Sequence, residues 1–232
     1  MTDLPAHLAR YHRQAILPGI GPEGQARLAA SHAAIVGVGA LGSVIVDLLS
    51  RAGVGTLTII DRDVVELTNL QRQVLYDEDD AREGLPKVEA AARRLRRVNS
   101  ACRVFAEAED LRPGPAGDAE RVLGVLGDPA ARPGVIVDGT DNFATRYLLN
   151  DVCVKHGVAL VYGGAVGSGG TQTTFVPGVT PCLRCLQPAP PAAGEIETCD
   201  TAGVLAMTTT IVAACQATDA LKVLLGRADL LS

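Results

Sequence analysis

The sequence predicts an α/β fold built on a doubly wound, mostly parallel sheet. Short apolar runs, typical of buried strands, alternate with longer stretches of helical periodicity over the first two thirds of the chain. A glycine turn of the form G-x-G-x-x-G follows the first apolar run, at residues 37–42. Hydrophobic residues make up 47% of the 232 positions, enough to cover such a sheet with helices on both faces.

Strands are expected where short runs rich in valine and isoleucine are bounded by glycine, proline or acidic residues. These runs lie at residues 33–36, 56–60, 104–106, 135–138, 158–162 and 171–176. Glycines 163, 164, 167, 169 and 170 fall between the last two runs, so we expect them to form the connection.

Helices are expected between these strands and at both ends of the chain. The first covers residues 4–16, with an apolar stripe of Leu4, Leu8, Tyr11, Ala15 and Ile16. The others lie at residues 23–31, 41–52, 86–98, 119–126, 142–156 and 201–225, the last with a break near 208–210. Segments without regular signal are an irregular stretch at 62–84, a surface loop at 112–117 and a proline-rich loop at 177–198.

The glycine turn and the acid that follows it predict a nucleotide site in a Rossmann-like sheet. Gly37 allows the tight turn, Gly39 lets backbone N–H groups approach a phosphate, and Gly42 lets the following helix pack close. The N-terminus of that helix favours an anion. Asp61 ends the second expected strand, where its carboxylate can accept from ribose hydroxyls. A turn that only packs a helix on the sheet would leave Asp61 unexplained.

Polar residues beyond Asp61 favour a triphosphate over a redox dinucleotide. Arg72 and Lys87 follow the second strand, and Asp138 and Asp141 follow a later one. Ligands bind at these strand ends in open α/β sheets. Cations there can hold β- and γ-phosphate oxygens, and a carboxylate can hold Mg²⁺. Each residue alone is most simply a surface charge, so the prediction of ATP and Mg²⁺ rests on their combination.

Short motifs along the chain occur in the order of a known family. They are RYHRQ at 10–14, GVGALG at 37–42, DRD at 61–63, LTNLQRQ at 67–73, PKVE at 86–89, DGTDN at 138–142, PCLRC at 181–185 and TCDTAGVL at 198–205. By these motifs the chain resembles the ThiF/MoeB-type adenylating enzymes, which are relatives of ubiquitin-activating enzymes.

The resemblance implies a single adenylation domain over residues 1–232. It divides the chain into an N-terminal helical extension at 1–31, a nucleotide-binding half at 32–163 and a carrier-binding half at 164–232. The last part is expected to add an antiparallel portion to the sheet and to contain a crossover loop at 186–200.

The resemblance also implies a reaction and its residues. ATP activates the C-terminal Gly-Gly carboxylate of a small ubiquitin-fold sulfur-carrier protein, giving an acyl-adenylate and pyrophosphate. The family pattern assigns the nucleotide contacts to Gly37, Gly39, Ala40, Gly42, Asp61, Asp63, Asn69, Arg72, Gln73, Lys87, Asp141 and Asn142. Among these, the resemblance implies that Asn69, Arg72 and Lys87 bind phosphates and that Asp141 holds Mg²⁺. Arg13 matches an arginine that family members donate to their partner's ATP, which implies a homodimer.

The cysteines divide into core positions and candidate functional positions. Cys102, Cys153 and Cys215 lie in apolar segments and are expected in the core. Cys182 and Cys185 form a C-x-x-C, half of the ligand set of a structural zinc site. The family has a second C-x-x-C nearer its C-terminus, and none follows in this sequence. Zn²⁺ therefore remains an open alternative.

Cys199 is a candidate catalytic residue. It lies in a polar loop just before the last expected helix, whose positive end could lower the thiol pKa. Glu197 and Asp200 act in the opposite direction. By resemblance, some family members use this cysteine to attack the adenylate and others do not need it. An unreactive loop thiol is the other interpretation.

Charge and hydropathy exclude several classes of protein. The net charge is −5, and the cluster at residues 93–97, RRLRR, is most simply a solvated helix face, so a nucleic-acid surface is not expected. There is no membrane-spanning apolar run and no signal-like core at the N-terminus. We therefore expect a cytoplasmic protein with reduced cysteines.

Three other functions compete with carrier adenylation. A nicotinamide-dependent oxidoreductase would leave Arg72, Lys87 and Asp141 without a use. A relative of the tRNA threonylcarbamoyladenosine dehydratases would need a basic surface for tRNA. A non-catalytic family member would only bind a partner. The thiamine, molybdopterin, cysteine and tRNA-thiolation pathways all use such carriers, and the carrier, its pathway and a separate sulfur donor stay open.

Overall fold

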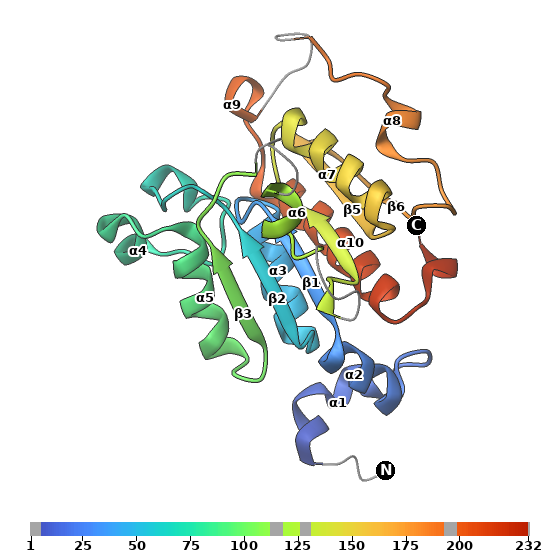
Figure 1. Cartoon of the computed structure of the whole chain (residues 1–232). Coiled ribbons are helices and arrows are strands. Elements are labelled where there is room, and N and C mark those ends of the chain that lie inside the picture. The colour runs from blue at the N-terminus through green and yellow to red at the C-terminus, as the bar shows by residue number, and fades with distance from the viewer. Residues whose placement is uncertain (1–5, 112–117, 126–130, 193–198, 232) are drawn as a thin grey trace.

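The computed structural model describes residues 6–111, 118–125, 131–192 and 199–231 as one sheet between two layers of helices (Figure 1). The six strands have the order β3-β2-β1-β4-β5-β6. Neighbouring strands from β3 to β5 are parallel, and β6 pairs with β5 in the antiparallel direction. The predicted doubly wound sheet with an antiparallel C-terminal portion is therefore confirmed.

The bounds of the elements match most of the predicted segments. The strands are β1 (His32–Val36), β2 (Thr56–Ile60), β3 (Arg103–Glu107), β4 (Val135–Asp138), β5 (Ala159–Val166) and β6 (Gly169–Phe175). The helices are α1 (His12–Ala15), α2 (Gly21–Ala30), α3 (Gly42–Ala52), α4 (Glu78–Glu83), α5 (Lys87–Val98), α6 (Asp118–Val122), α7 (Phe143–His156), α8 (Leu183–Leu186), α9 (Cys199–Ala202) and α10 (Ala206–Leu224). Short 3₁₀ helices cover Ala6–Tyr11, Leu67–Asn69 and Ala228–Leu230.

Side chains of the central strands alternate between two hydrophobic cores. On β1, Ala33 and Ile35 pack with residues of α3, α5 and α10, whereas Ala34 and Val36 pack with residues of α6 and α7. Both faces of a parallel strand are covered in such a fold, so a continuous apolar run is what the strand requires. This two-sided burial holds the carboxyl ends of β1, β2 and β4 at one edge of the sheet, where the site is built.

The N-terminal segment differs from the single predicted helix. The chain forms a 3₁₀ helix over Ala6–Tyr11 and then one turn of α-helix, α1. Leu8 and Ala15 are buried as expected, but Ile16 follows the last helical residue and is 53% exposed. Gln14 attaches α1 to the rest of the fold, because its side chain donates to the carbonyl oxygen of Ala52 at the end of α3. Leu4, the first residue of the predicted stripe, lies outside the described residues.

The glycines predicted to connect the last two strands lie mostly inside them. Gly163 and Gly164 belong to β5 and pair with Gln172 and Thr171 of β6. The chain reverses near Gly167, whose φ of +60° suits the turn. A Cβ atom at Gly163 would overlap the Gln216 side chain on α10, so glycine there allows the helix to approach the sheet closely.

The predicted C-terminal helix is interrupted at a different place. The break lies between α9 and α10, where Gly203 has a φ of +71° and Val204 forms a bridge with Gly167. Thr209 and Thr210, at the predicted break, lie inside α10, and their hydroxyl groups donate to the carbonyl oxygen of Ala206 within its first turn. Within the described ranges, no helix has both the length and the hydropathy needed to cross a bilayer. The predicted loop at 112–117 lies outside those ranges.

Candidate active site

A cavity of about 900 Å³ opens at the carboxyl ends of β1, β2 and β4. It collects residues that are far apart in the chain but that the sequence predicted to act together. Those that line it are Gly37, Gly39, Ala40, Asp61, Asp63, Asn69, Arg72, Gln73, Lys87, Asp141 and Asn142. Gly42 lies just behind the wall, at the start of α3.

The glycine turn has the close backbone approaches that the motif requires. Gly37 has a φ of +82°, and a Cβ atom on it would lie 2.7 Å from the carbonyl oxygen of Gly139. A Cβ atom on Gly42 would overlap the carbonyl oxygen of Gly37. Gly39 has space, because only the Gln73 side chain lies near its missing Cβ, at 3.7 Å. The turn therefore presents bare backbone to the cavity at Gly39, as a phosphate site needs.

Asp61 fastens the turn to the end of β2. Its Oδ2 accepts from the backbone N–H of Val38 at 2.7 Å, and its Oδ1 accepts from that of Asp63 at 2.9 Å. Burial raises the pKa of Asp61, while the nearby Lys87 acts in the opposite direction. Each carboxylate oxygen can accept more than one hydrogen bond, so the group can hold the turn and still meet a ribose.

Lys87 and Asp63 form an ion pair at the floor of the cavity. Lys87 Nζ lies 2.9 Å from Asp63 Oδ2, and the lysine side chain is only 8% exposed whereas that of Asp63 is 55% exposed. The backbone supports the pair, since Lys87 N–H donates to the Asp63 carbonyl oxygen at 2.9 Å. A buried stem that ends in a charged group at the cavity wall is suited to bind an anion there.

Asn69 and Arg72 belong to the segment that closes this side of the cavity. Asn69 is buried, and its Oδ1 accepts from the backbone N–H of Glu66 at 3.0 Å. Arg72 donates from Nη1 to the Thr68 carbonyl oxygen at 3.0 Å, which holds its guanidinium along the cavity wall. Gln73 is 4% exposed and, in the described structure, its Oε1 has no hydrogen-bond partner.

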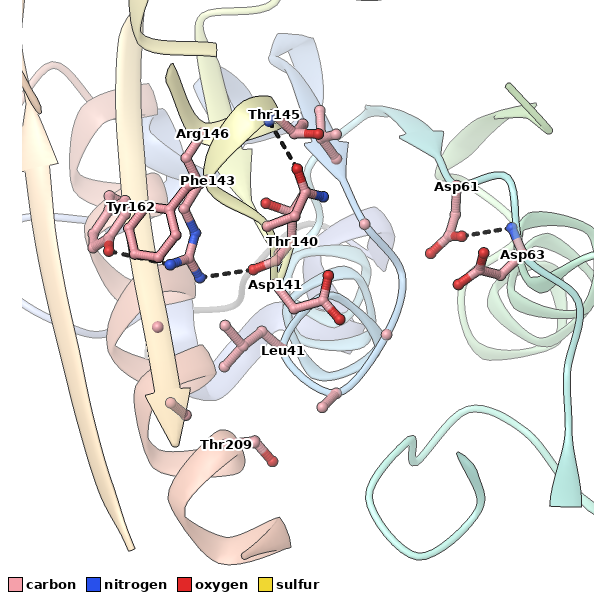
Figure 2. A pocket seen from close by; sticks show the side chains of 18 of the residues that line it. Leu41, Asp61, Asp63, Thr140, Asp141, Phe143, Thr145, Arg146, Tyr162 and Thr209 are labelled. Atoms are coloured by element: carbon pink, nitrogen blue, oxygen red, sulfur yellow. Dashed lines mark hydrogen bonds between the residues drawn. The ribbon is translucent and has the colours of Figure 1, made fainter. Parts of the chain in front are cut away.

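The opposite wall follows β4, and its two aspartates have different environments. Asp138 is fully buried and accepts at Oδ1 from the backbone N–H and the hydroxyl group of Thr140, at 2.9 and 2.7 Å. Asp141 is exposed and lines the cavity, and Figure 2 shows it across from Asp61 and Asp63. Asn142 caps α7 by accepting from Thr145 N–H. Asp138 is thus a structural residue, and Asp141 is the carboxylate available to a metal.

Comparisons with known proteins agree with this geometry. The ThiF family model matches residues 11–231. The chain belongs to the ThiF family. It is 47% identical to the sulfur carrier protein ThiS adenylyltransferase of Bacillus subtilis over 217 residues, which cover 94% of this chain and 61% of that protein. It is 43% identical to the SAMP-activating enzyme E1 of Haloferax volcanii over 224 residues, 97% of this chain and 78% of that protein.

A solved structure shares the fold. The crystal structure of E. coli MccB with ATP superposes with a TM-score of 0.70 at 25% identity, covering 88% of this chain and 59% of that chain. The chain therefore spans about three fifths of the length of some of the proteins that it matches.

Two residues of this ThiF-family site were missed by sequence reasoning. Tyr76 is buried and donates from its hydroxyl group to the carbonyl oxygen of Val38 at 2.7 Å, so it stabilises the glycine turn through a backbone contact. Burial raises its pKa well above the ordinary value. Arg146 is 8% exposed and lines the cavity next to Asp138. The available signal for Arg146 was a cation in the first turns of a helix, where the dipole disfavours positive charge.

Arg13 does not reach the cavity of its own chain. It is exposed on α1, which lies at the opposite end of the sheet from the strand ends that form the site (Figure 1). Its predicted role, donation to the site of a partner subunit, stays a prediction.

The predicted zinc ligands lie close together. The Sγ atoms of Cys182 and Cys185 are 3.7 Å apart. Burial raises the pKa of Cys182, but the backbone N–H groups of Cys185 and Arg184 and the Cys185 thiol outweigh it, so the pKa is lowered overall. Among the described residues no group of three or more His, Cys, Asp or Glu side chains could hold a metal. Two thiolates alone do not complete a tetrahedral zinc site, so the described residues do not fit Zn²⁺ unaided.

The other cysteines agree only in part with the sequence predictions. Cys102 and Cys153 are buried, and burial raises the pKa of Cys153 to about 12, so its thiol is inert. Cys215 is exposed on α10 and its predicted core position is wrong, because it shares the outer stripe of the helix with Met207 and Ile211. Cys199 begins α9, two residues before the predicted helix start. Residues 193–198 of the loop before it lie outside the described residues.

Proposed function

We propose that this chain transfers AMP from ATP to the C-terminal carboxylate of a small ubiquitin-fold sulfur-carrier protein. The observation that carries the proposal is one cavity that combines a glycine turn with open backbone, two buried or held cations and an exposed carboxylate with a second wall that contains three glycines. The names of two similar proteins support it, since one is a sulfur carrier adenylyltransferase and the other activates SAMP.

The nucleotide would occupy the part of the cavity next to β1 and β2. The bare backbone at Gly39 and the start of α3 suit the phosphates, and Asp61 suits the ribose hydroxyls. Arg72 and Lys87 would neutralise the triphosphate and then the departing pyrophosphate. Both cations are held by hydrogen bonds before ATP arrives, so little reorganisation is needed in the transition state.

Magnesium fits the donor set of the opposite wall. Mg²⁺ is usually bound by one or two carboxylates together with substrate phosphates and water, and Asp141 is an exposed carboxylate that faces the nucleotide region. When bound, the ion would supply positive charge to the phosphates of the substrate.

The carrier tail would enter along the strand pair β5–β6. Gly164, Gly169 and Gly170 line the cavity there, together with Val204 and Thr209 from the C-terminal part of the chain. The three glycines leave room for an extended backbone to approach closely, and a Gly-Gly terminus brings no side chains of its own. We call this part of the cavity, which is lined by residues 164–166 and 169–171, the channel.

The chemistry needs positioning more than acid or base catalysis. An oxygen of the tail carboxylate attacks the α-phosphorus of ATP, a new P–O bond forms, and the bond to the β-phosphate oxygen breaks to release pyrophosphate. Holding the two reactants in line and neutralising charge can provide most of the acceleration for such a step. No described residue has to exchange a proton with the carboxylate, because the carboxylate attacks as an anion.

Several further features belong to the same proposal. Two chains would pair so that Arg13 of each completes the other's site. The Cys199 thiolate would attack the acyl carbon of the adenylate, forming a thioester while the C–O bond to AMP breaks and AMP leaves, and a separate sulfur donor would then supply the sulfur. Cys182 and Cys185 would provide two zinc ligands to a site completed by other residues. We expect the reaction to take place in the cytoplasm, where ATP is available and thiols stay reduced.

Co-expression with candidate carriers tests the proposal. A carrier that ends in Gly-Gly should acquire the mass of AMP, and the adduct should disappear when Asp141 is replaced by alanine. Absence of the adduct from every Gly-Gly-ended carrier that binds the protein would contradict the proposal. Replacement of Cys199 by serine should preserve the adenylate and remove any thiol-sensitive adduct.

A further inference from the structure

Arg146 occupies a position that is costly for a cation. It lies in the first turns of α7, close to the positive end of the helix, and only 8% of its surface is exposed. A buried guanidinium is stable only when its charge and its donors are satisfied. Arg146 is also in the wall of the cavity, between the nucleotide region and the channel. Because burial of a cation at this end of a helix is unfavourable, we expect Arg146 to have a role between the nucleotide region and the channel.

The guanidinium joins two segments that come from different strands. Nη2 donates to the carbonyl oxygen of Thr140, just before Asp141, at 2.9 Å, and to the carbonyl oxygen of Gly163 on β5 at 3.2 Å. Nε lies 3.4 Å from Oδ2 of the buried Asp138. The loop that presents the candidate magnesium carboxylate is therefore connected through one side chain to the wall of the channel.

Two aromatic rings fix the plane of the group. The guanidinium carbon lies 5.3 Å from the ring centroid of Phe143 and 5.1 Å from that of Tyr162. Nη1 also donates to the Tyr162 hydroxyl oxygen at 3.3 Å. Figure 2 shows Arg146 beside Phe143 and Tyr162, with its nitrogen atoms directed to Thr140 and to the Tyr162 hydroxyl. The side chain is thus held in one orientation by charge, stacking and hydrogen bonds together.

At Gly164, no side chain separates the Arg146 guanidinium from the channel. A Cβ atom at Gly164 would lie 3.4 Å from Nη2 and 3.6 Å from Nη1. Gly164 lines the cavity, so a chain that passes along it comes close to the positive charge of Arg146. A carboxylate that enters there is attracted toward the same group that holds the Thr140–Asp141 segment.

We propose that Arg146 is a positioning residue for adenylation, which fixes Asp141 relative to the channel along which the substrate carboxylate arrives. This inference rests on the proposed function, because it assumes that an acyl substrate uses the channel. Arg146 acts through the loop before Asp141 and through β5, and it needs no contact with the phosphates. Lysine keeps the charge but cannot both bridge two carbonyl oxygens and stack between two rings. The proposed role therefore depends on the planar geometry of the guanidinium group and not on its charge alone.

The test compares Arg146→Lys and Tyr162→Phe with wild type, with Arg51→Lys as a matched control. Arg51 also pairs with an aspartate, Asp47, at 2.8 Å, but on the exposed surface of α3. Three quantities are measured for each protein: kcat for carrier-dependent ATP–pyrophosphate exchange, the Kd for α,β-methylene-ATP without carrier, and Tm. We expect kcat of Arg146→Lys to fall by about 100-fold, the scale for a misplacement of about 1 Å, while the Kd changes by less than about twofold.

The outcomes separate a positioning role from a structural one. A fall in kcat with the Kd retained supports the inference. Wild-type kcat in Arg146→Lys overturns it, and so does a parallel loss of kcat, nucleotide affinity and Tm, which indicates that Arg146 only holds the fold. If Arg146→Lys does not fold, Tyr162→Phe decides: a lower kcat at unchanged Tm supports the inference and an unchanged kcat overturns it. Absence of exchange in the wild-type protein would contradict the proposed function instead.

Discussion

The two walls of the cavity are built by different means. The nucleotide wall, from the glycine turn to Lys87, is a set of polar groups held by short hydrogen bonds, such as Val38 to Asp61 at 2.7 Å and Lys87 to Asp63 at 2.9 Å. The channel wall lies where β5 and β6 pair, and each of its three cross-strand pairs, 164 with 171, 165 with 170 and 166 with 169, contains one glycine. The first wall is preorganised to bind charge, whereas the second is shaped to admit a backbone. Changes to one wall should therefore leave the function of the other largely intact.

Removal of charge from the nucleotide wall, or of the Asp141 carboxylate that faces it from the end of β4, should have the largest effect. Lys87→Met and Asp141→Asn should each lower kcat for carrier-dependent ATP–pyrophosphate exchange by about 10²- to 10³-fold, since each removes a preorganised group that meets developing charge. Carrier binding, measured by calorimetry without ATP, should stay within about twofold. Asp47→Asn on the surface of α3 is the control. If Lys87→Met and Asp141→Asn lower the affinity for the carrier as much as they lower kcat, the two walls do not have separate functions.

Obstruction of the channel should give the complementary result. Gly164→Val adds a side chain next to Arg146 and into the channel. We expect the KM for the carrier to rise by at least about tenfold, equivalent to about 1.4 kcal/mol of lost carrier binding, with the Kd for an ATP analogue unchanged, because the added side chain occupies the channel and not the nucleotide wall. Steady-state kinetics with the carrier varied at saturating ATP measure the effect. A similar loss of nucleotide affinity would show that the walls are not independent.

The pH dependence of nucleotide binding should contain a step that belongs to Asp61. Burial raises the pKa of its carboxyl group, so the group becomes protonated at a higher pH than an ordinary aspartate as the pH falls. The protonated carboxyl group has lost its negative charge, so it is a weaker acceptor for the hydroxyl groups of the ribose. ATP affinity should therefore begin to fall on the acid side before the usual aspartate range is reached. Asp61→Asn should bind more weakly but lack this step, and an unchanged pH profile in that variant would assign the step to another group.

Changes at the cysteines outside the cavity should have the smallest effects. At neutral pH, iodoacetamide should modify Cys182 well before Cys153, since the pKa of Cys182 is lowered and that of Cys153 is raised to about 12. Cys215→Ser should change the free energy of unfolding by less than about 0.5 kcal/mol, because the side chain is on the surface. Peptide mapping measures the labelling, and rapid modification of Cys153 in folded protein would contradict its burial.

The nucleotide wall could be predicted from the sequence because its parts follow one another along the chain. A buried strand, three spaced glycines, a helix and an acid at the next strand end specify one local geometry, and the structure has it at Gly37, Gly42 and Asp61. The same rule failed for the glycines at 163–170. Their spacing carries no information about strand pairing, nor about the close approach of α10, whose Gln216 and Val212 pack against Gly163 and Gly170.

Residues whose role depends on tertiary contacts could not be found in this way. Tyr76 donates to Val38 and Arg146 donates to Gly163, and in both pairs the partners are well separated in the sequence. No rule of residue spacing predicts such a contact. The exposed position of Cys215 also depends on which face of α10 meets the sheet. Helical periodicity indicated a buried helix but did not identify its outer stripe.

Carrier-dependent ATP–pyrophosphate exchange by the purified protein tests the central claim most directly. Radiolabelled pyrophosphate is supplied with ATP, Mg²⁺ and a sulfur carrier that ends in a free Gly-Gly carboxylate, and with the same carrier after amidation of that carboxylate. We predict exchange with the free carboxylate and none with the amide. Exchange that is equal with both carriers, or absent with every carrier that binds the protein, would contradict the claim that this cavity forms an acyl-adenylate.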